Sequence, residues 1–291
     1  MLNYKETPIQ EILDVHTEKA GVHLLMKRED LNHPLVSGNK WWKLKYNLEE
    51  AVRKNSKALL TYGGAFSNHI LATAASAAEL GLKSIGIIRG EQTLPLNPVL
   101  AFALSKGMEL QYVSRSAYRT KSETDNYLER FENFYWIPEG GSNLLAVKGV
   151  MEFVSTITIP YDYLCCPVGT GGTLSGFIEG AAADKKIIGF AVLKGGEFLK
   201  DEVHKLSHKS RGSHGWRIVH DYHFGGYAKT DLKLARFMEE FTTAHLIPLD
   251  PIYTGKMMAG IYDLLSKGFF ARGSTILAVH TGGLQTNRYL I

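Results

Sequence analysis

Residues 57–81 have the sequence KALLTYGGAFSNHILATAASAAELG, and this stretch decides the fold class. The apolar run 57–62 predicts a buried strand that a pair of glycines closes with a turn. The alanine-rich run 67–80 predicts a helix, which Ser67 or Asn68 caps and a further glycine ends. A strand, a glycine turn and a helix in this order form the start of a βαβ unit, so parallel strands covered by helices are expected.

The same alternation continues along the chain. Further strands are expected at 84–88, 109–113, 134–137, 162–166, 187–192 and 274–279, and further helices at 97–106, 122–132, 143–156 and 173–183. A polar, glycine-containing break at 138–143 (PEGGSN) separates two series of these elements. Since no repeat and no linker rich in proline or serine is found, two α/β units with crossed-over chain ends are predicted, each with a parallel sheet.

Composition excludes several classes of protein. The chain has 291 residues, long enough for about two domains, and 33 Lys and Arg against 29 Asp and Glu give a net charge of only +4. This charge is too small to indicate nucleic-acid binding. The start lacks the apolar core of a signal peptide, and no apolar run is long enough for a membrane span. The two cysteines, Cys165 and Cys166, are adjacent and cannot form a disulfide framework, so a cytoplasmic protein is expected.

The stretch 200–229 is the least regular, and it contains five of the 11 histidines. His204 and His208 have the i,i+4 spacing with which one helix face can bind a metal ion. The sequence implies no third ligand, and the lysines and arginine nearby indicate a solvated face. No metal site is therefore predicted.

Three segments carry candidate chemistry, and the first is the glycine-rich stretch 168–176 (VGTGGTLSG) between a predicted strand and a helix. Glycines let backbone N–H groups converge on an anion, and the helix that follows presents its positive end. The spacing is neither that of a P-loop nor Gly-x-Gly-x-x-Gly. A single phosphate group is the ligand that fits, and the alternative is a plain tight turn.

The second segment is 37–44 (SGNKWWKL), in which Lys40 stands among small and polar residues. A lysine whose pKa is lowered is the nucleophile that forms a Schiff base with an aldehyde. Lys43 lies one helical turn further on, where its positive charge is expected to lower the pKa of Lys40. An ordinary exposed lysine at a helix start is the alternative interpretation.

The third segment is 61–69 (TYGGAFSNH), a strand-to-helix turn that ends in polar residues. Its N–H groups are able to hold a carboxylate, with the Ser67 hydroxyl beside them. Alternatively, Ser67 and Asn68 only cap the helix. His69 falls inside the helix, where a structural role is expected.

A Schiff-base lysine, a phosphate cradle and a carboxylate turn together describe a pyridoxal-phosphate enzyme that acts on an amino acid. At this point the chain resembles a known family, the fold type II (tryptophan-synthase-β-like) pyridoxal-phosphate enzymes that include 1-aminocyclopropane-1-carboxylate deaminase and D-cysteine desulfhydrase. Residues 27–31 (KREDL), 37–44, 63–69, 138–149 (PEGGSNLLAVKG), 168–176, 249–256 (LDPIYTGK) and 280–283 (HTGG) carry the resemblance, in the expected order.

The resemblance implies a role for each matching position around the cofactor. Lys40 matches the lysine that binds pyridoxal 5'-phosphate covalently, and Asn68 matches the residue that hydrogen-bonds the ring hydroxyl. The backbone that matches the phosphate cradle comprises Thr170, Gly171, Gly172 and Thr173. The family also implies a homodimer and two α/β domains with the cofactor between them, a small domain at 43–142 and a large domain built from 1–42 and 143–291.

The substrate side of the site is also implied by resemblance. Ser67 and its neighbours match the carboxylate site, and Tyr253 matches an active-site tyrosine. In the deaminases the positions of Thr254 and Thr281 typically hold glutamate and leucine. Desulfhydrases tend to carry a hydroxyl residue or another neutral group at the first position and threonine at the second. The alternative is that both threonines are ordinary packing residues with satisfied hydroxyls. A glutamate near the pyridine nitrogen would make the ring a strong electron sink, which opening a cyclopropane needs more than losing a thiolate does.

The favoured activity is therefore a lyase that converts D-cysteine to pyruvate, hydrogen sulfide and ammonia. The closest alternative is 1-aminocyclopropane-1-carboxylate deaminase, which opens its substrate to 2-oxobutanoate and ammonia. A silent amino-acid-binding protein would lack Lys40 or the glycine loop, and a nucleotide-dependent oxidoreductase would need a better Gly-x-Gly-x-x-Gly. Trp42 and Phe66 depart from the family pattern, as does a shortened connection at 114–123. These departures leave the substrate open.

Overall fold

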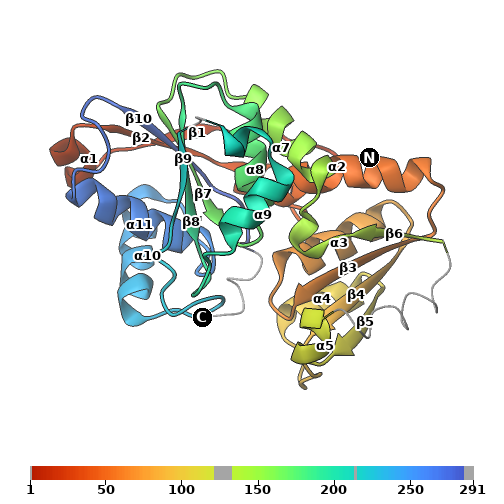
Figure 1. The fold of residues 1–291 in the computed structure, drawn as a ribbon. Coiled ribbons are helices and arrows are strands. Elements are labelled where there is room, and N and C mark those ends of the chain that lie inside the picture. Colours follow the sequence, from red (N-terminus) through yellow and green to blue (C-terminus); the bar gives the residue numbers. More distant parts are fainter. Residues whose placement is uncertain (1, 121–132, 213–214, 285–291) are drawn as a thin grey trace.

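Two sheets organise the fold in the computed structural model, which describes residues 2–120, 133–212 and 215–284 (Figure 1). The larger sheet has six strands in the order β1-β2-β10-β7-β8-β9. Their bounds are β1 Ile9–Ile12, β2 His23–Lys27, β10 Thr275–Val279, β7 Tyr163–Val168, β8 Lys186–Ala191 and β9 Trp216–Val219. All neighbours pair in parallel except β1, which runs antiparallel to β2 at the edge.

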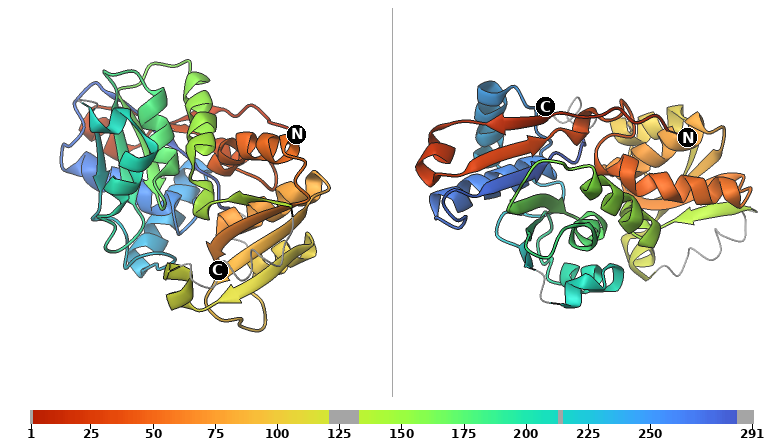
Figure 2. Two further views of the ribbon diagram at one scale, coloured as in Figure 1. Left: turned by 45° about the vertical axis from the view of Figure 1, so that its right-hand side comes forward. Right: turned by 90° about the horizontal axis from the view of Figure 1, so that it is seen from above.

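The smaller sheet has four strands, all parallel, in the order β5-β4-β3-β6. Their bounds are β5 Met108–Val113, β4 Lys83–Arg89, β3 Ala58–Gly64 and β6 Phe134–Ile137. Both views in Figure 2 show this sheet as one lobe and the larger sheet as another. The predicted class, an α/β fold with two open parallel sheets, is confirmed.

Helices cover the faces of both sheets (Figure 1). They are α1 Val15–Ala20, α2 Asn39–Arg53, α3 Asn68–Glu79, α4 Pro98–Ser105, α5 Arg115–Thr120, α7 Leu144–Ser155, α8 Gly172–Gly180, α9 Leu199–Leu206, α10 Leu232–His245 and α11 Thr254–Ser266, with 3-10 turns η1 Glu29–Leu31, η2 Glu139–Gly141 and η3 Lys209–Arg211. Ser67, Asn97 and Asn143 cap α3, α4 and α7, because each side chain accepts hydrogen bonds from N–H groups of the first turn.

The predicted alternation of strands and helices is confirmed wherever the structure describes it, with ends that shift by a few residues. The helix predicted at 122–132 lies outside the described residues. The irregular stretch 200–229 contains most of α9 and the edge strand β9, which is only four residues long. The sequence pattern missed this edge strand, in which no residue is fully buried.

The larger sheet separates two hydrophobic cores. Leu164 and Cys166 of β7 face the core under α8, whereas Tyr163 and Cys165 face the core under α11. Successive side chains of a strand point to opposite faces, so the adjacent cysteines are buried on opposite sides of the sheet as free thiols.

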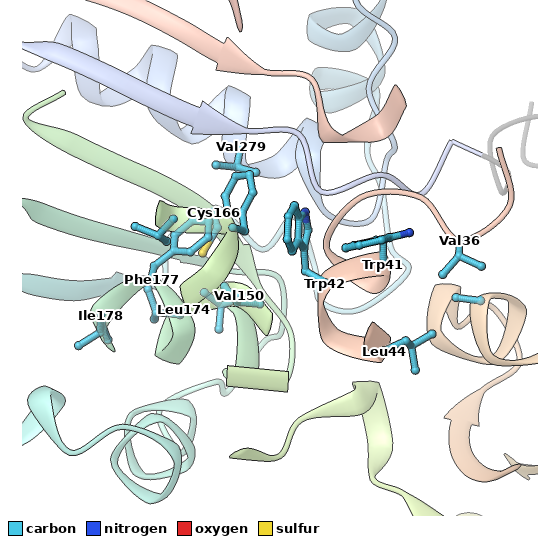
Figure 3. Packing of buried hydrophobic residues seen from close by; sticks show 14 of the residues in the cluster. Val36, Trp41, Trp42, Leu44, Val150, Cys166, Leu174, Phe177, Ile178 and Val279 are labelled. Carbon is cyan, nitrogen blue, oxygen red and sulfur yellow. The ribbon is translucent and has the colours of Figure 1, made fainter. Parts of the chain in front are cut away.

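Helix α2 packs on α7 through aromatic contacts, in a hydrophobic core (Figure 3) that also includes Leu59 and Ile137 of the smaller sheet. The rings of Trp41 and Trp42 pack edge to face, with centroids 4.8 Å apart, and Trp42 contacts Phe153 of α7 at 5.6 Å. The Trp42 indole N–H also donates to Glu29 Oε2 over 2.7 Å. Trp42, which departs from the family pattern, is therefore a core residue with a satisfied polar atom.

The crossing of α2 and α7 depends on Gly149. A Cβ atom at this position would lie 1.9 Å from the carbonyl oxygen of Trp42. We expect Gly149→Ala to destabilise the protein by about 1–3 kcal/mol or more, because the two helices must separate. Urea unfolding measures this loss, and Ser155→Ala on the exposed side of α7 is the control that should change little. Equal stability of the two variants would contradict the close crossing.

Candidate active site

The ends of parallel strands from both sheets converge on one pocket of about 460 Å³. Gly64 and Arg89 come from the carboxyl ends of β3 and β4, and Pro138 follows β6. On the opposite side, Gly169 follows β7 and Thr281 follows β10. Ligands of open α/β sheets bind outside the carboxyl ends of the strands, so this pocket is the expected place for a site.

Lys40 enters the pocket from the first turn of α2. Gly38 precedes this turn with φ of 68°, and a Cβ atom there would lie 1.9 Å from the carbonyl oxygen of Thr281. Only glycine permits so close an approach. The Lys40 ammonium donates to Asn39 Oδ1 over 2.9 Å. Burial lowers the pKa of Lys40 to about 8, and the charge of Asp250 partly opposes this shift. Such a pKa leaves roughly a tenth of the amine free at pH 7, far more than for an ordinary lysine, which suits a nucleophile.

Lys43 was expected to lower the pKa of Lys40 through its positive charge, and the structure shows a different arrangement. It is buried, and its ammonium donates to Gly140 O and, over 3.0 Å, to Ser142 Oγ. Burial, followed by the charge of Lys40, lowers the pKa of Lys43 well below its usual range. The predicted lowering of the Lys40 pKa is thus confirmed, but its cause is burial. The charge effect acts on Lys43 instead.

The glycine loop forms a cradle at the N-terminus of α8. Gly171 has φ of 82°, and a Cβ atom on Gly172 would lie 2.7 Å from Ser142 Oγ and 3.0 Å from Lys43 Nζ. The Thr170 hydroxyl lies 2.6 Å from Ser142 Oγ, and the Thr173 hydroxyl accepts from Asn39 Nδ2 over 2.8 Å. Backbone N–H groups, hydroxyls and an amine thus surround a small space that suits one phosphate group.

Opposite the cradle lies the turn that begins α3. Ser67 Oγ accepts from the N–H groups of His69 and Ile70, so Ser67 does cap the helix. Ser67 also lines the pocket. The amide oxygen of Asn68 is buried and, within the described residues, has no hydrogen-bond partner. Such an unpaired group beside a pocket is available to a ligand.

His69 is fully enclosed at the base of this turn. Its Nε2 lies 2.8 Å from Thr61 Oγ1. Burial, together with the charges of Lys40 and Lys43, lowers the pKa of His69 well below its usual range. The imidazole is therefore neutral at physiological pH, and it packs close to Gly141 of η2.

The substrate-side residues predicted from resemblance divide into two groups. Tyr253 and Thr281 line the pocket, and the Tyr253 ring centroid lies 6.0 Å from Lys40 Nζ. Thr254 lies behind this lining and is fully buried. Its hydroxyl donates to Asp250 Oδ1 over 2.6 Å and accepts from the Asp250 N–H over 3.0 Å.

The sequence reasoning missed several pocket residues, among them Arg89, Glu202 and Tyr227, and it gave Glu139 no role of its own. Arg89 ends β4, and its position at the carboxyl end of a strand was a usable signal. Its guanidinium lies 5.6 Å from the ring centroid of Tyr118. Tyr227 comes from the irregular stretch, and its ring packs edge to face on Tyr253 at 6.2 Å. Burial raises the pKa of both tyrosines, so both phenols keep their protons.

The histidine pair of the irregular stretch has other contacts. His204 Nδ1 lies 2.9 Å from Ser210 Oγ, and its ring packs on Trp216. Across the described residues, no group of three His, Cys, Asp or Glu side chains is arranged to hold a metal ion. No helix in that part of the chain has both the length and the apolar character needed to cross a membrane.

Comparison with known proteins identifies the class to which this fold and pocket belong. Residues 1–282 match the family described as pyridoxal-phosphate dependent enzymes, and the chain belongs to that family. Within it, the chain falls in the group of 1-aminocyclopropane-1-carboxylate deaminases and D-cysteine desulfhydrases.

The similarity extends over nearly the whole chain. A Pyrococcus abyssi protein, provisionally named 1-aminocyclopropane-1-carboxylate deaminase, is 32% identical over 96% of this chain and 89% of its own. D-cysteine desulfhydrase of Salmonella newport is 27% identical over 95% of this chain and 91% of its own. A crystal structure described as an ACC deaminase homologue superposes with a TM-score of 0.83, at 30% identity, covering 99% of this chain and 92% of the other.

The predicted family, cofactor and enzyme class are thus confirmed. Residues of this pocket fit pyridoxal phosphate on three observations: an amine with a lowered pKa at Lys40, a cradle that a Cβ on Gly172 would fill, and the unpaired amide oxygen of Asn68. The roles of the individual site residues remain predictions.

Proposed function

We propose that this enzyme is a lyase that converts D-cysteine and water to pyruvate, hydrogen sulfide and ammonia. One observation carries the choice. The two positions that distinguish the deaminases from the desulfhydrases in the family pattern hold Thr254 and Thr281, which are neutral hydroxyl residues. The Thr254 hydroxyl is engaged with Asp250, and Thr281 borders the pocket. Neither side chain can supply the charge that a glutamate would supply.

The residues of the pocket are suited to the steps of such an elimination. Pyridoxal phosphate, when bound, supplies an electron sink that makes the Cα proton of an amino acid acidic. In the proposed enzyme the cradle from Thr170 to Thr173 holds the phosphate, and the N–H groups and hydroxyl at Ser67 hold the substrate carboxylate. Lys40, with a pKa of about 8, accepts the Cα proton. Tyr253 keeps its phenolic proton and is able to donate a hydrogen bond to the departing sulfur.

A substrate panel tests the proposal. Keto acid, sulfide and ammonia are measured with D-cysteine, L-cysteine and 1-aminocyclopropane-1-carboxylate under identical conditions. We expect sulfide and pyruvate from D-cysteine at a kcat/KM at least about tenfold above that for the cyclopropane substrate, because a thiolate leaves more easily than a ring opens. Faster production of 2-oxobutanoate from the cyclopropane substrate would instead establish the deaminase, the activity after which the Pyrococcus abyssi relative is named.

We further propose the organisation that the family resemblance implies: a small domain at 43–142, a large domain from 1–42 and 143–291, and a homodimer in the cytoplasm. Two buried free thiols, Cys165 and Cys166, suit a reducing compartment. Sedimentation equilibrium, compared with the 32.4 kDa chain mass, measures the oligomeric state.

A further inference from the structure

Lys256 of α11 is a fully buried lysine outside the lining of the pocket. It stands in the first turn of its helix, where the helix dipole disfavours a positive charge. Burial lowers the pKa of Lys256 to about 8, and the charges of Asp250 and Asp231 oppose the shift. A group placed at such a cost to stability calls for a structural or functional reason.

The Lys256 ammonium donates to two main-chain carbonyls of one loop. His223 O accepts over 2.8 Å and Gly226 O over 2.7 Å. These carbonyls mark the two ends of a tight turn, which Gly226 N closes by donating to His223 O over 3.0 Å. The ammonium therefore fixes both ends of the turn at once.

The turn needs such support, because its backbone is strained. Within the turn Phe224 has φ of 48°, and two residues beyond it Ala228 has φ of 54°, unusual values for residues with a side chain. Strained backbone persists only where surrounding contacts impose it. In this loop the contacts include the two hydrogen bonds from Lys256.

The residue that follows the turn is Tyr227, which lines the pocket. Its ring packs on Tyr253 at a centroid distance of 6.2 Å, and its Cε1 lies 3.9 Å from the place of a Cβ on Gly64. The direction in which Tyr227 points thus depends on the geometry of the preceding turn. Lys256 is thus connected to the pocket through its hydrogen bonds to the turn and through the packing of Tyr227 on Tyr253.

We propose that Lys256 is a positioning residue, whose buried ammonium fixes the turn 223–226 and thereby holds Tyr227 against Tyr253 in the active site. The inference rests on the proposed active site and not on the choice of substrate. Without the ammonium, the turn relaxes from its strained backbone conformation and Tyr227 loses its fixed place beside Tyr253.

Hydrogen exchange on the purified protein is the first test. In Lys256→Met, which keeps most of the side-chain volume and loses the charge, we expect the amides of Gly226 and Lys229 to exchange at least about tenfold faster than in the wild type. Both amides donate hydrogen bonds within this loop. Amides in β7 and β8 should keep their wild-type rates.

Lys209→Met is the matched control. The Lys209 ammonium also donates to a main-chain carbonyl, Glu179 O over 2.6 Å, but it is exposed and lies outside the pocket lining. This variant should leave exchange at 226 and 229 unchanged. If Lys256→Met fails to fold, Lys256→Gln, which keeps an amide donor without the charge, takes its place in the same comparison.

A double-mutant cycle on kcat/KM with Tyr227→Phe is the second test, run on the substrate that the wild type turns over fastest. If Lys256 acts through Tyr227, adding Lys256→Met to Tyr227→Phe costs less than Lys256→Met alone. Strictly additive losses, or wild-type exchange at Gly226 and Lys229, would overturn the proposal. A wild type without sulfide release from D-cysteine contradicts only the proposed function and leaves the exchange result standing.

Discussion

Lys40→Ala is expected to abolish covalent cofactor binding and to lower kcat/KM by roughly 10²- to 10⁴-fold or more, since the variant loses both the nucleophile and the proposed base. The wild type, incubated with pyridoxal phosphate, should show the visible absorption band of a bound imine, and borohydride should fix the label on the peptide that contains Lys40. The variant should show neither. The expectation follows from the lowered pKa of Lys40 and its position inside the pocket.

Lys43→Ala is the matched control, because Lys43 is the neighbouring amine and lies only one helical turn away. It should keep the reducible label on Lys40 and lose part of its cofactor affinity, since the Lys43 ammonium borders the cradle at Gly172. If Lys40→Ala kept the full borohydride-fixed label and Lys43→Ala lost it, Lys43 and not Lys40 would be the lysine that binds the cofactor.

A large loss of cofactor affinity is also expected when Gly172 of the phosphate cradle is replaced. A β-branched side chain in Gly172→Val would occupy the space between Ser142 Oγ and Lys43 Nζ, 2.7 Å and 3.0 Å from the Cβ position. We expect the Kd for pyridoxal phosphate to rise at least about tenfold, because the phosphate loses the close backbone approach that it needs. Spectroscopic titration of the cofactor-free protein measures the Kd.

Two further measurements separate loss of the cradle from loss of the fold. Far-ultraviolet circular dichroism of Gly172→Val should stay near that of the wild type. Gly215→Val, at an exposed position where the Cβ meets atoms no closer than 3.6 Å, should leave the Kd unchanged. An unaltered Kd in Gly172→Val would mean that this loop is only a tight turn between β7 and α8.

The parts of the fold that local sequence determines were predictable. Strand β3, its glycine turn and α3 lie within 22 consecutive residues, and Ser67, Asn97 and Asn143 cap helices through bonds to the next turn. Lys40 and the glycine loop were predictable because glycine spacing reports close backbone approach.

Other features depend on contacts between distant segments. The burial of Lys43 requires Gly140 and Ser142, nearly 100 residues along the chain. Tyr227 reaches the pocket from a loop whose positive φ angles fall partly on Phe224 and Ala228, residue types that give no sign of such a backbone. The hydrogen bond from the Thr254 hydroxyl to Asp250 joins residues only four apart in the sequence. The sequence pattern nevertheless does not indicate which group the hydroxyl of a buried threonine will bond.

Helix α2, which carries Lys40, also has contacts in both lobes. Its first half packs through Trp42 on Phe153, and further along Asn47 Oδ1 accepts from Tyr135 Oη of β6 over 3.2 Å and from Asn143 Nδ2 over 2.7 Å. A boundary drawn between 42 and 43 therefore cuts a single helix. The small lobe is consequently not a module that recombination could exchange alone, because a foreign lobe would have to reproduce the surface that anchors the lysine.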